Sequence, residues 1–205
     1  MKIVCISDMH GMLPLLPECD LLLIAGDVCP PPYWPVNEAI ERQARWLNDV
    51  FRSWLESTKC KAIVGIAGNH DVVFESFPPS LSWIYLQDSG VNWGGLKIWG
   101  TPWSKWIITP WPYEWAFGAE DTEQQYRFTK IPIDVDILVS HAPPLSILDE
   151  TNNGIHAGSE VLLDRIKHLP NLKMHVFGHI HEAAGMKEVD GKVFVNACKG
   201  WMVEA

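Results

Sequence analysis

Apolar residues along the chain form short continuous runs, separated by longer segments of helical periodicity. Residues 2–7 (KIVCIS) and 20–25 (DLLLIA) are apolar nearly throughout instead of alternating. Such runs predict strands that are buried on both faces. Residues 61–67, 135–140 and 173–177 have a similar character and predict three further strands.

Two segments have the spacing of amphipathic helices. Asn37 is a candidate N-cap for a helix that reaches about Glu56, because apolar residues recur there at intervals of three and four. That apolar face comprises Ile40, Ala44, Leu47, Val50, Phe51 and Trp54. A second helix is expected from about Ser159 to His168, with Leu162, Leu163 and Ile166 facing inward.

Two-residue turn signals mark two hairpins. Gly94-Gly95 separates VNW from LKIW, and Asp190-Gly191 separates KEV from KVFV. Because strands both alternate with helices and pair in hairpins, the pattern predicts an α/β sandwich of two mixed sheets with helices outside. No repeat, linker or low-complexity tract interrupts the sequence, so residues 1–205 are expected to form a single domain.

Composition narrows the range of partners. Hydrophobic residues make up 47% of the chain and charged residues 20%, which is typical of a folded globular protein. The net charge of −9 argues against a broad surface for nucleic acid or for an anionic membrane. A small anionic substrate stays compatible with this charge, because a bound metal ion supplies positive charge of its own.

Targeting signals and cysteine usage predict a soluble, cytoplasmic protein. Only four apolar residues, 3–6, precede Ser7, and the longest apolar run, 21–25, cannot span a bilayer. The five cysteines are Cys5, Cys19, Cys29, Cys60 and Cys198. They are odd in number and lack C-x-x-C spacing, so we expect reduced thiols, several of them packed as small apolar residues.

Five polar motifs each come directly after an apolar strand. They are Asp8-x-His10, Gly26-Asp27, Gly68-Asn69-His70-Asp71, Ser140-His141-Ala142-Pro143-Pro144 and Gly178-His179-Ile180-His181. Each motif alone is compatible with ordinary turn chemistry. Five of the eight histidines lie in them, however, and neither turns nor packing explain that coincidence. The motifs together therefore predict one site at the strand ends.

The candidate ligands in these motifs are carboxylates, one amide and imidazoles: Asp8, Asp27, Asn69, His10, His141, His179 and His181. Seven ligands are too many for one ion and suit two. Nitrogen and oxygen donors without thiolate favour Mn, Fe, Zn, Co or Ni over Mg or Ca. One carboxylate can bridge two ions. We therefore expect two divalent transition-metal ions as cofactors, with Mn favoured.

The order of the motifs resembles the calcineurin-like metallophosphoesterase superfamily. D-x-H, G-D, G-N-H-D, H and G-H-x-H occur in family order from Asp8 to His181. The stretch Gly100-Thr101-Pro102-Trp103, the SHAPP box and the closing FGHIHE also look like the MPPED-type branch. Some mammalian members of that branch lack one histidine of the final motif, whereas this chain keeps both. The resemblance implies a four-layer α/β/β/α sandwich and metal-dependent hydrolysis of a phosphoester.

The resemblance also implies roles for single residues. One metal would be held by Asp8, His10 and His181, the second by Asn69, His141 and His179, with Asp27 as the bridge. His70 would face the substrate as proton donor or charge stabiliser, and Asn69 would also contact the substrate. A metal-bound hydroxide would then attack phosphorus in line, without a covalent enzyme intermediate.

One departure from the family favours a particular substrate class. Protein serine/threonine phosphatases and their dinucleotide-hydrolysing relatives continue G-D with an acid-arginine segment, but here Gly26-Asp27 runs into VCPPP. The arginines all lie outside the motifs: Arg42, Arg45, Arg52, Arg127 and Arg165. A site without a bidentate arginine grips a phosphomonoester dianion poorly. The expected substrate is therefore a small phosphodiester, such as a cyclic or linear nucleotide.

Tryptophan is unusually frequent, and five of the eleven copies lie within residues 99–115: Trp99, Trp103, Trp106, Trp111 and Trp115. Core packing is their ordinary role. The alternative is a wall beside the metals that stacks on a nucleobase, with Trp103 as the accessible ring. Trp46 and Trp54 instead fit the core face of the first helix.

The remaining polar residues have weaker signals. His156, His168 and His175 are expected at the surface or in satisfied polar positions, and Asn196 is expected to bind backbone. Asp71 either orients His70 or caps the next turn. Two alternative functions stay open: a nuclease acting on longer DNA or RNA, and a non-catalytic protein-interaction scaffold on the same fold.

Overall fold

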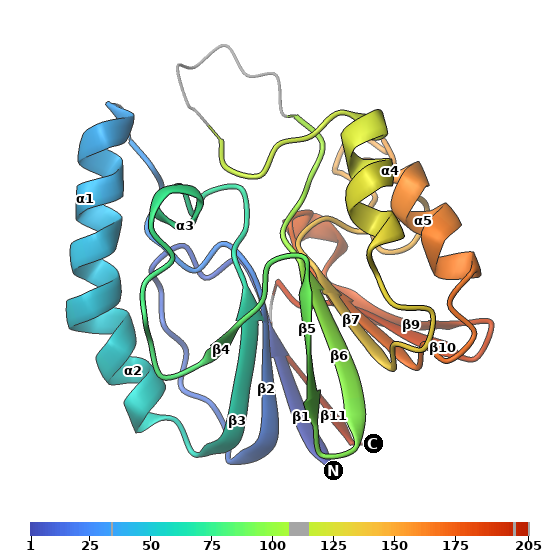
Figure 1. The fold of residues 1–205 in the computed structure, drawn as a ribbon, viewed down its shortest axis with the longest axis horizontal. Coiled ribbons are helices and arrows are strands. Elements are labelled where there is room, and N and C mark those ends of the chain that lie inside the picture. Colours follow the sequence, from blue (N-terminus) through green and yellow to red (C-terminus); the bar gives the residue numbers. More distant parts are fainter. Residues whose placement is uncertain (34, 107–114, 199, 205) are drawn as a thin grey trace.

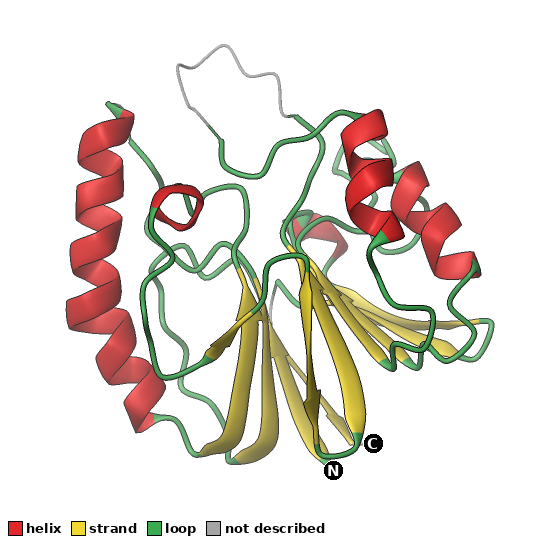
Figure 2. Ribbon diagram, in the orientation of Figure 1, coloured by secondary structure: helices red, strands yellow, loops and turns green. Residues whose placement is uncertain are grey.

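Two β-sheets pack face to face, and helices cover both outer sides (Figures 1 and 2). The computed structural model describes residues 1–33, 35–106, 115–198 and 200–204. On one side lie α1 (Val36–Trp46) and α2 (Arg52–Ser57), and on the other lie α4 (Asp121–Thr129) and α5 (Glu160–Lys167). The predicted α/β/β/α sandwich is therefore confirmed.

The first sheet has the strand order β11-β1-β2-β3-β4. These strands are β1 (Lys2–Ile6), β2 (Cys19–Ala25), β3 (Cys60–Ile66), β4 (Ile84–Tyr85) and β11 (Trp201–Glu204). Strands β1 to β4 are parallel, and β11 joins β1 antiparallel. The three long parallel strands are those that the apolar runs predict, whereas the two short strands at the edges have no clear sequence signal.

The second sheet has the order β5-β6-β7-β8-β10-β9. Its strands are β5 (Ser89–Trp93), β6 (Leu96–Thr101), β7 (Ile137–Ser140), β8 (Met174–Phe177), β9 (Gly185–Val189) and β10 (Lys192–Asn196). The pairs β5–β6 and β9–β10 are the two predicted hairpins. The four central strands are parallel, so this sheet is also mixed.

Alternate residues of the buried strands face two different apolar layers. In β1, Ile3 and Cys5 face the second sheet, whereas Val4 and Ile6 belong to the layer under the helices. All four side chains are at most 3% exposed. Burial on both faces explains why these strands are apolar at every position instead of alternating.

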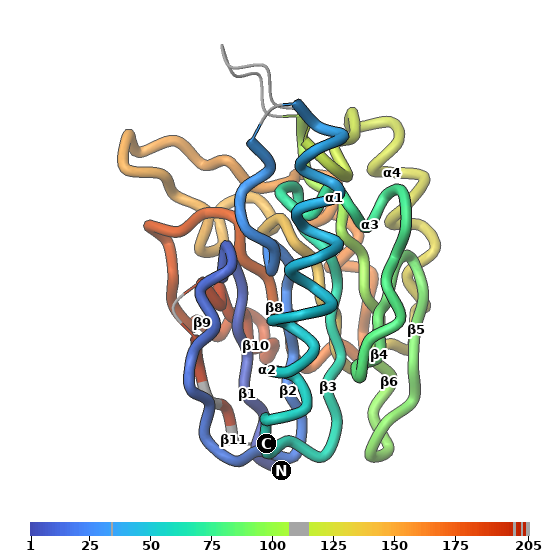
Figure 3. The backbone as a smooth tube through the Cα atoms, turned by 90° about the vertical axis from the view of Figure 1, so that its left-hand side faces the viewer, coloured from blue at the N-terminus to red at the C-terminus, as the bar shows by residue number. Residues whose placement is uncertain are grey.

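The predicted first helix forms, but its turns are not uniform. It runs as α1, a π-helical segment η1 (Leu47–Phe51) and α2, and Figure 3 shows it lying over the first sheet, alongside β2 and β3. Its N-cap is Pro35 instead of Asn37. Val50 is 46% exposed, so the prediction that it faces the core is wrong, because the wider π turn rotates the inner face away from it. Trp46 and Trp54 pack beside Phe51 as expected.

The remaining helical elements are the second predicted helix and three that the sequence did not indicate. Helix α5 begins after Ser159, whose side chain accepts a hydrogen bond from the Leu162 N–H. Leu162 and Ile166 are buried and Leu163 is partly buried, as predicted. Helix α3 (Val73–Ser76), helix α4 and the 3-10 turn η2 (His181–Ala183) were not predicted.

Cys19 and Cys60 form a disulfide, so the prediction that all five cysteines are reduced is wrong for this pair. The two residues are register partners at the starts of the parallel strands β2 and β3, with Cα atoms 4.7 Å apart. Strand pairing thus brings together two cysteines that lie 41 residues apart in sequence. Cys5, Cys29 and Cys198 are free thiols.

The helices of the structure are short. None of the helices in the described part of the chain is both long enough and apolar enough to cross a bilayer.

Candidate metal centre

The five polar motifs leave the carboxyl ends of five strands, β1, β2, β3, β7 and β8. Within each sheet these strands are parallel, so their carboxyl ends lie along one edge. In Figure 1 this edge is the top of the sandwich, below the connecting loops. The prediction that every motif follows a strand is confirmed, and the topology explains how residues from 8 to 181 reach one place.

The backbone at this edge is bent into an unusual conformation. Asp8, His10, Asp27 and His179 have φ of 55°, 46°, 53° and 70°, which is the left-handed region that non-glycine residues rarely adopt. Backbone hydrogen bonds hold it there, since the Asp8 N–H donates to Gly26 O and the His10 N–H to Asp27 O. Concentration of this conformation at one place is typical of a functional site.

Glycine is required where the loops press against the carboxylates. A Cβ at Gly68 would overlap Asp27 Oδ1, and a Cβ at Gly178 would overlap Asp8 Oδ2. The glycines of two motifs therefore allow close approach of the backbone, in addition to making turns.

Asp8, His10 and His181 form one group of facing donor atoms. Asp8 Oδ1 lies 3.1 Å from His181 Nε2 and 3.9 Å from His10 Nε2. The two Nε2 atoms are 3.4 Å apart. Oδ2 of Asp8 is held on the other side by the Ser7 hydroxyl (2.6 Å) and the His179 N–H (2.9 Å). The carboxylate thus has one oxygen fixed by the protein and one directed at the two imidazoles.

Asn69, His141 and His179 form the second group. Asn69 Oδ1 lies 2.8 Å from His141 Nε2 and 2.9 Å from His179 Nδ1. Asn69 and His141 are at most 1% exposed. Two imidazoles from different strands of the second sheet are therefore directed at one amide oxygen from the first sheet.

Asp27 lies between the two groups. Its Oδ2 is 3.5 Å from His141 Nε2, 3.8 Å from His10 Nε2 and 3.8 Å from His70 Nε2. Its Oδ1 accepts the His70 N–H at 2.8 Å. The residue that the family pattern names as the bridge is thus the one whose carboxylate faces side chains of both groups.

The donor chemistry of the second group fits a cation. His141 Nδ1 lies 2.9 Å from Ala25 O and donates to it, so in a neutral ring Nε2 is an acceptor. That atom faces the Asn69 amide oxygen, which is also an acceptor. Two acceptors at 2.8 Å need a positive group between them, either a proton on the imidazole or a metal ion.

The pKa values of His141 and Asp8 show that the centre favours positive charge. Burial opposes the charged imidazolium of His141, but the charge of Asp27 and its hydrogen bond raise the pKa of His141 to about 10. Burial also opposes the charged carboxylates, yet His181, His141 and further hydrogen bonds hold the pKa of Asp8 well below its usual range. The pocket is therefore built to hold positive charge beside two ionised carboxylates.

His70 lies against this centre, and its ring packs edge-on against two other aromatic rings. Its ring is edge-on to His10 and to Trp115, with ring centroids 4.5 Å and 4.4 Å away. Burial lowers the pKa of His70 to about 4, and Asp27 opposes this shift only in part. The ring is thus neutral at physiological pH in this arrangement.

Asp71 accepts hydrogen bonds from backbone N–H groups, and among the described residues it does not bond the His70 ring. It is fully buried and accepts the N–H groups of Gly68 (2.8 Å), Cys29 (2.8 Å) and Val28 (3.2 Å). Of the two roles considered for it, capping the turn is the one observed. It ties the loop after β2 to the loop after β3, and burial together with Asp27 raises its pKa to about 7.

Two residues at the centre were missed by sequence reasoning. Gln43 on α1 is 1% exposed and donates from Nε2 to His70 O at 2.7 Å. A glutamine among the inward positions of an amphipathic helix was the available signal for it. The Cys198 thiol donates to Asp8 Oδ2 at 3.2 Å, and Asp8, His181 and Cys198 together form a group close enough to share an ion. No spacing rule pointed to Cys198.

The prediction that Trp103 offers an accessible ring is wrong. Trp103 is 9% exposed, its indole N–H donates to Asp88 at 2.9 Å, and Arg127 lies over its face. Packing against a neighbouring helix thus buries the ring. Trp115 contacts His70, a residue of the third motif, and Trp111 lies outside the described residues.

The other histidines and Asn196 have structural partners. His175 is buried and its Nε2 lies 2.7 Å from Ser140 Oγ, while His156 Nδ1 lies 2.7 Å from Asp149. His168 is exposed on the end of α5. Asn196 donates to Leu148 O and Ile180 O, which confirms its backbone role and fastens the loop before His181.

Comparison with known proteins identifies the class. Residues 1–183 match the family model described as calcineurin-like phosphoesterase, so the chain belongs to that family. The family is one of phosphoester hydrolases that bind divalent metal ions. The human protein called "Metallophosphoesterase domain-containing protein 1" is 30% identical over an alignment 228 residues long, which covers 96% of this chain. This similarity confirms the predicted resemblance to the MPPED-type branch.

The matched region covers 65% of that human relative, so this chain spans about two thirds of its length. Solved structures share the fold at lower sequence identity. One has a TM-score of 0.69 at 15% identity and covers 98% of this chain and 94% of its own. The crystal structure of TT1561 from Thermus thermophilus has a TM-score of 0.57 at 13% identity, with 96% and 88% covered.

Proposed function

We propose that this chain is a phosphodiesterase that acts on a small diester at a centre of two divalent metal ions, with Mn favoured. The observation that carries the proposal is the position of Asp27 between two groups of donor atoms. Asp8, His10 and His181 would hold one ion, and Asn69, His141 and His179 the other, with Asp27 shared. Bound ions would supply positive charge for the phosphate and lower the pKa of water.

The protein side chains would do the rest. Ser7, Ala25 O and the backbone of His179 fix the orientation of Asp8 and His141, so that the ligand atoms are directed before a substrate arrives. His70, held beside Asp27 and edge-on to Trp115, would stabilise the charge on the leaving oxygen by donating a hydrogen bond from its neutral ring. To act as the proton donor the ring would first have to take up a proton, against the burial that lowers its pKa. Asn69 would also contact the phosphate.

The arginines support a diester over a monoester. Arg42 pairs with Glu38, Arg127 with Asp88 and Glu123, and Arg165 donates to Ile131 O, so these guanidinium groups are engaged away from the five motifs. A phosphomonoester carries a second negative charge that a bidentate arginine would offset. We expect a small substrate and no extended nucleic-acid surface.

The test is turnover of matched chromogenic esters by protein loaded with Mn. We expect bis(p-nitrophenyl) phosphate to be hydrolysed with a higher kcat/KM than p-nitrophenyl phosphate, and Asp27→Ala and His141→Ala to abolish both reactions. Turnover of the diester no greater than in these two variants would contradict the proposed activity. A clear preference for the monoester would contradict the proposed substrate class.

A further inference from the structure

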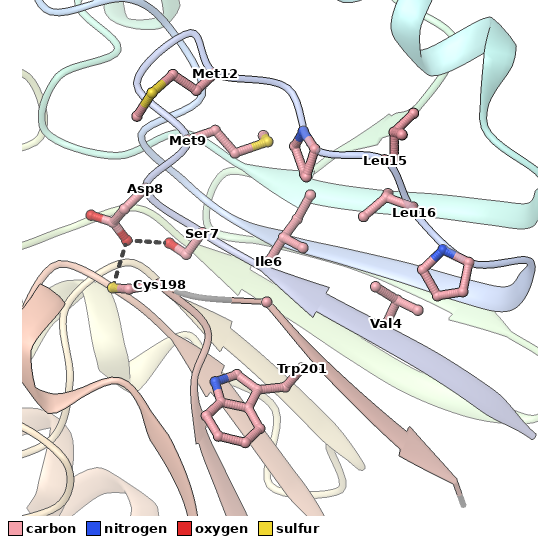
Figure 4. Close-up of a pocket in the computed structure, with 13 residues that line it drawn as sticks. Val4, Ile6, Ser7, Asp8, Met9, Met12, Leu15, Leu16, Cys198 and Trp201 are labelled. Carbon is pink, nitrogen blue, oxygen red and sulfur yellow. Dashed lines mark hydrogen bonds between the residues drawn. The ribbon is translucent and has the colours of Figure 1, made fainter.

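A cavity of about 410 Å³ lies beneath the loop that follows β1. Figure 4 shows it between that loop and strand β11. Its walls include Val4 and Ile6 of β1, Met9, Met12 and Leu16 of the loop, and Trp201 of β11. A volume of this size is within the range of small-molecule sites.

The cavity and the metal centre share one wall. Asp8 and Cys198 lie at one end of the cavity, and Val4 and Leu15 lie toward the other (Figure 4). Asp8 directs Oδ1 at His181 and Oδ2 at Cys198, so one carboxylate separates the candidate metal site from the apolar space. A phosphate held on the His181 side would have its substituents next to the cavity.

A single turn also connects the two spaces. The Met12 N–H donates to Met9 O at 2.8 Å, which closes a turn around His10. His10 is thereby directed at Asp8 and Asp27, whereas the methionines at both ends of the turn line the cavity. A ligand at the metal centre and an apolar group in the cavity would therefore contact the same short segment.

The lining selects an uncharged apolar group. Among the described residues that line the cavity, Asp8 is the one with a formal charge, and a second phosphate would be repelled by it. Methionine side chains adapt to irregular apolar ligands. Met12 is 75% exposed and Leu15 is 101% exposed, so apolar surface at the rim stays open to solvent.

We propose that this cavity binds a hydrocarbon substituent of the phosphodiester whose phosphate lies at the metal centre. The inference rests on the proposed function and specifies its substrate class: a diester with at least one uncharged, apolar ester group. Affinity would rise with the length of that group, because each added methylene leaves water for the cavity.

Binding tests the cavity without turnover. We would titrate Mn-loaded protein with dihexyl phosphate and with dimethyl phosphate by calorimetry. We expect the dihexyl ester to bind at least about tenfold more tightly. Met12→Glu should remove most of this preference, and Met12→Leu should keep it. Met186→Glu is the matched control, because Met186 is 52% exposed on β9 and lines no part of this cavity, so the preference should be unchanged.

Turnover separates this inference from the proposed function. Hexyl p-nitrophenyl phosphate should have a kcat/KM at least about tenfold above that of the methyl ester, with the same dependence on residue 12. Equal binding and equal turnover of the short and long esters would overturn the cavity assignment and leave the diesterase standing. Chain-length-dependent binding without turnover of either ester would support the hydrocarbon site and contradict the diesterase. A dimer that Met12→Glu dissociates, with no chain-length preference, would assign this face to a second copy and overturn the inference.

Discussion

The His70 ring is packed edge-on against the indole of Trp115, with ring centroids 4.4 Å apart and an interplanar angle of 71°. His10 lies edge-on at 4.5 Å to the same His70 ring. Nδ1 of His70 is buried with no hydrogen-bond partner among the described residues. The orientation of the His70 ring thus depends on aromatic contacts. In many catalytic sites, by contrast, a carboxylate orients the imidazole.

Trp115 should therefore matter most where strong negative charge develops on the leaving oxygen. We expect Trp115→Ala to lower kcat roughly tenfold for a diester with an alkyl leaving group, because His70 would no longer be held to donate a hydrogen bond to the charged leaving oxygen. The p-nitrophenyl ester should change little, because p-nitrophenolate leaves without protonation. Trp115→Phe, which keeps a ring edge, should restore most of the loss. An equal decrease for both leaving groups would show that Trp115 has only a structural role.

Asp27 should be essential for metal retention as well as for turnover. Asp27→Asn removes the charge that both groups of donor atoms face, so we expect bound metal to decrease and diester turnover to fall by at least about 100-fold. Asp164→Asn is the matched control, since Asp164 is at an exposed position of α5 and pairs with Lys167 on the same helix. Metal analysis and turnover in Mn measure the effect, and an Asp27→Asn protein with wild-type metal content would contradict the shared-ligand role.

The disulfide between Cys19 and Cys60 should make a measurable contribution to stability. Titration of unfolded protein without reductant should find three thiols, and five after reduction, in line with the three free cysteines of the structure. Cys19→Ala with Cys60→Ala should lower the free energy of unfolding by about 2–4 kcal/mol. A reductant should lower the Tm of the wild type but leave that of the double variant unchanged. Five thiols before reduction would refute the pairing.

His175 should make the protein sensitive to acid. Burial lowers its pKa from 6.5 to about 3, so between these pH values the unfolded chain binds a proton that the folded chain does not. Above pH 6.5 the free energy of unfolding is therefore not reduced by protonation of His175. Below that pH it decreases on acidification, by up to about 1.4 kcal/mol per pH unit.

The comparison is between metal-free wild type and His175→Gln, unfolded in denaturant from pH 7 to pH 5. The variant should show a shallower decrease in the free energy of unfolding, and its amide can still bond Ser140. His168→Gln on the surface should follow the wild type. Identical slopes for wild type and His175→Gln would contradict this account.

Much of the fold could be predicted because its signals are local. The apolar runs of β1, β2 and β3 and the Asp190-Gly191 turn predict strands and a hairpin without knowledge of tertiary contacts. The motif order then identifies the candidate ligands, since each motif follows a strand. Strand β4 has only two residues, Ile84 and Tyr85, and is defined by its pairing with β3, so no periodicity could indicate it.

The errors concern features that depend on distant residues. Cys19 and Cys60 become neighbours only through the register of β2 and β3. Trp103 is buried because Asp88 accepts its N–H and Arg127 covers its face, and neither partner is evident from the tryptophan-rich stretch. Cys198 reaches Asp8 through the end of β10, far along the chain.

We propose that two metal ions, joined by Asp27, make this chain a phosphodiesterase. The most direct test is to titrate metal-free protein with Mn and to record bound metal and hydrolysis of bis(p-nitrophenyl) phosphate in the same samples. We expect turnover to rise to a plateau when two Mn ions are bound per chain, and Asp27→Asn to reach neither this stoichiometry nor this rate. A plateau at one ion per chain, or two bound ions without diester hydrolysis, would contradict it.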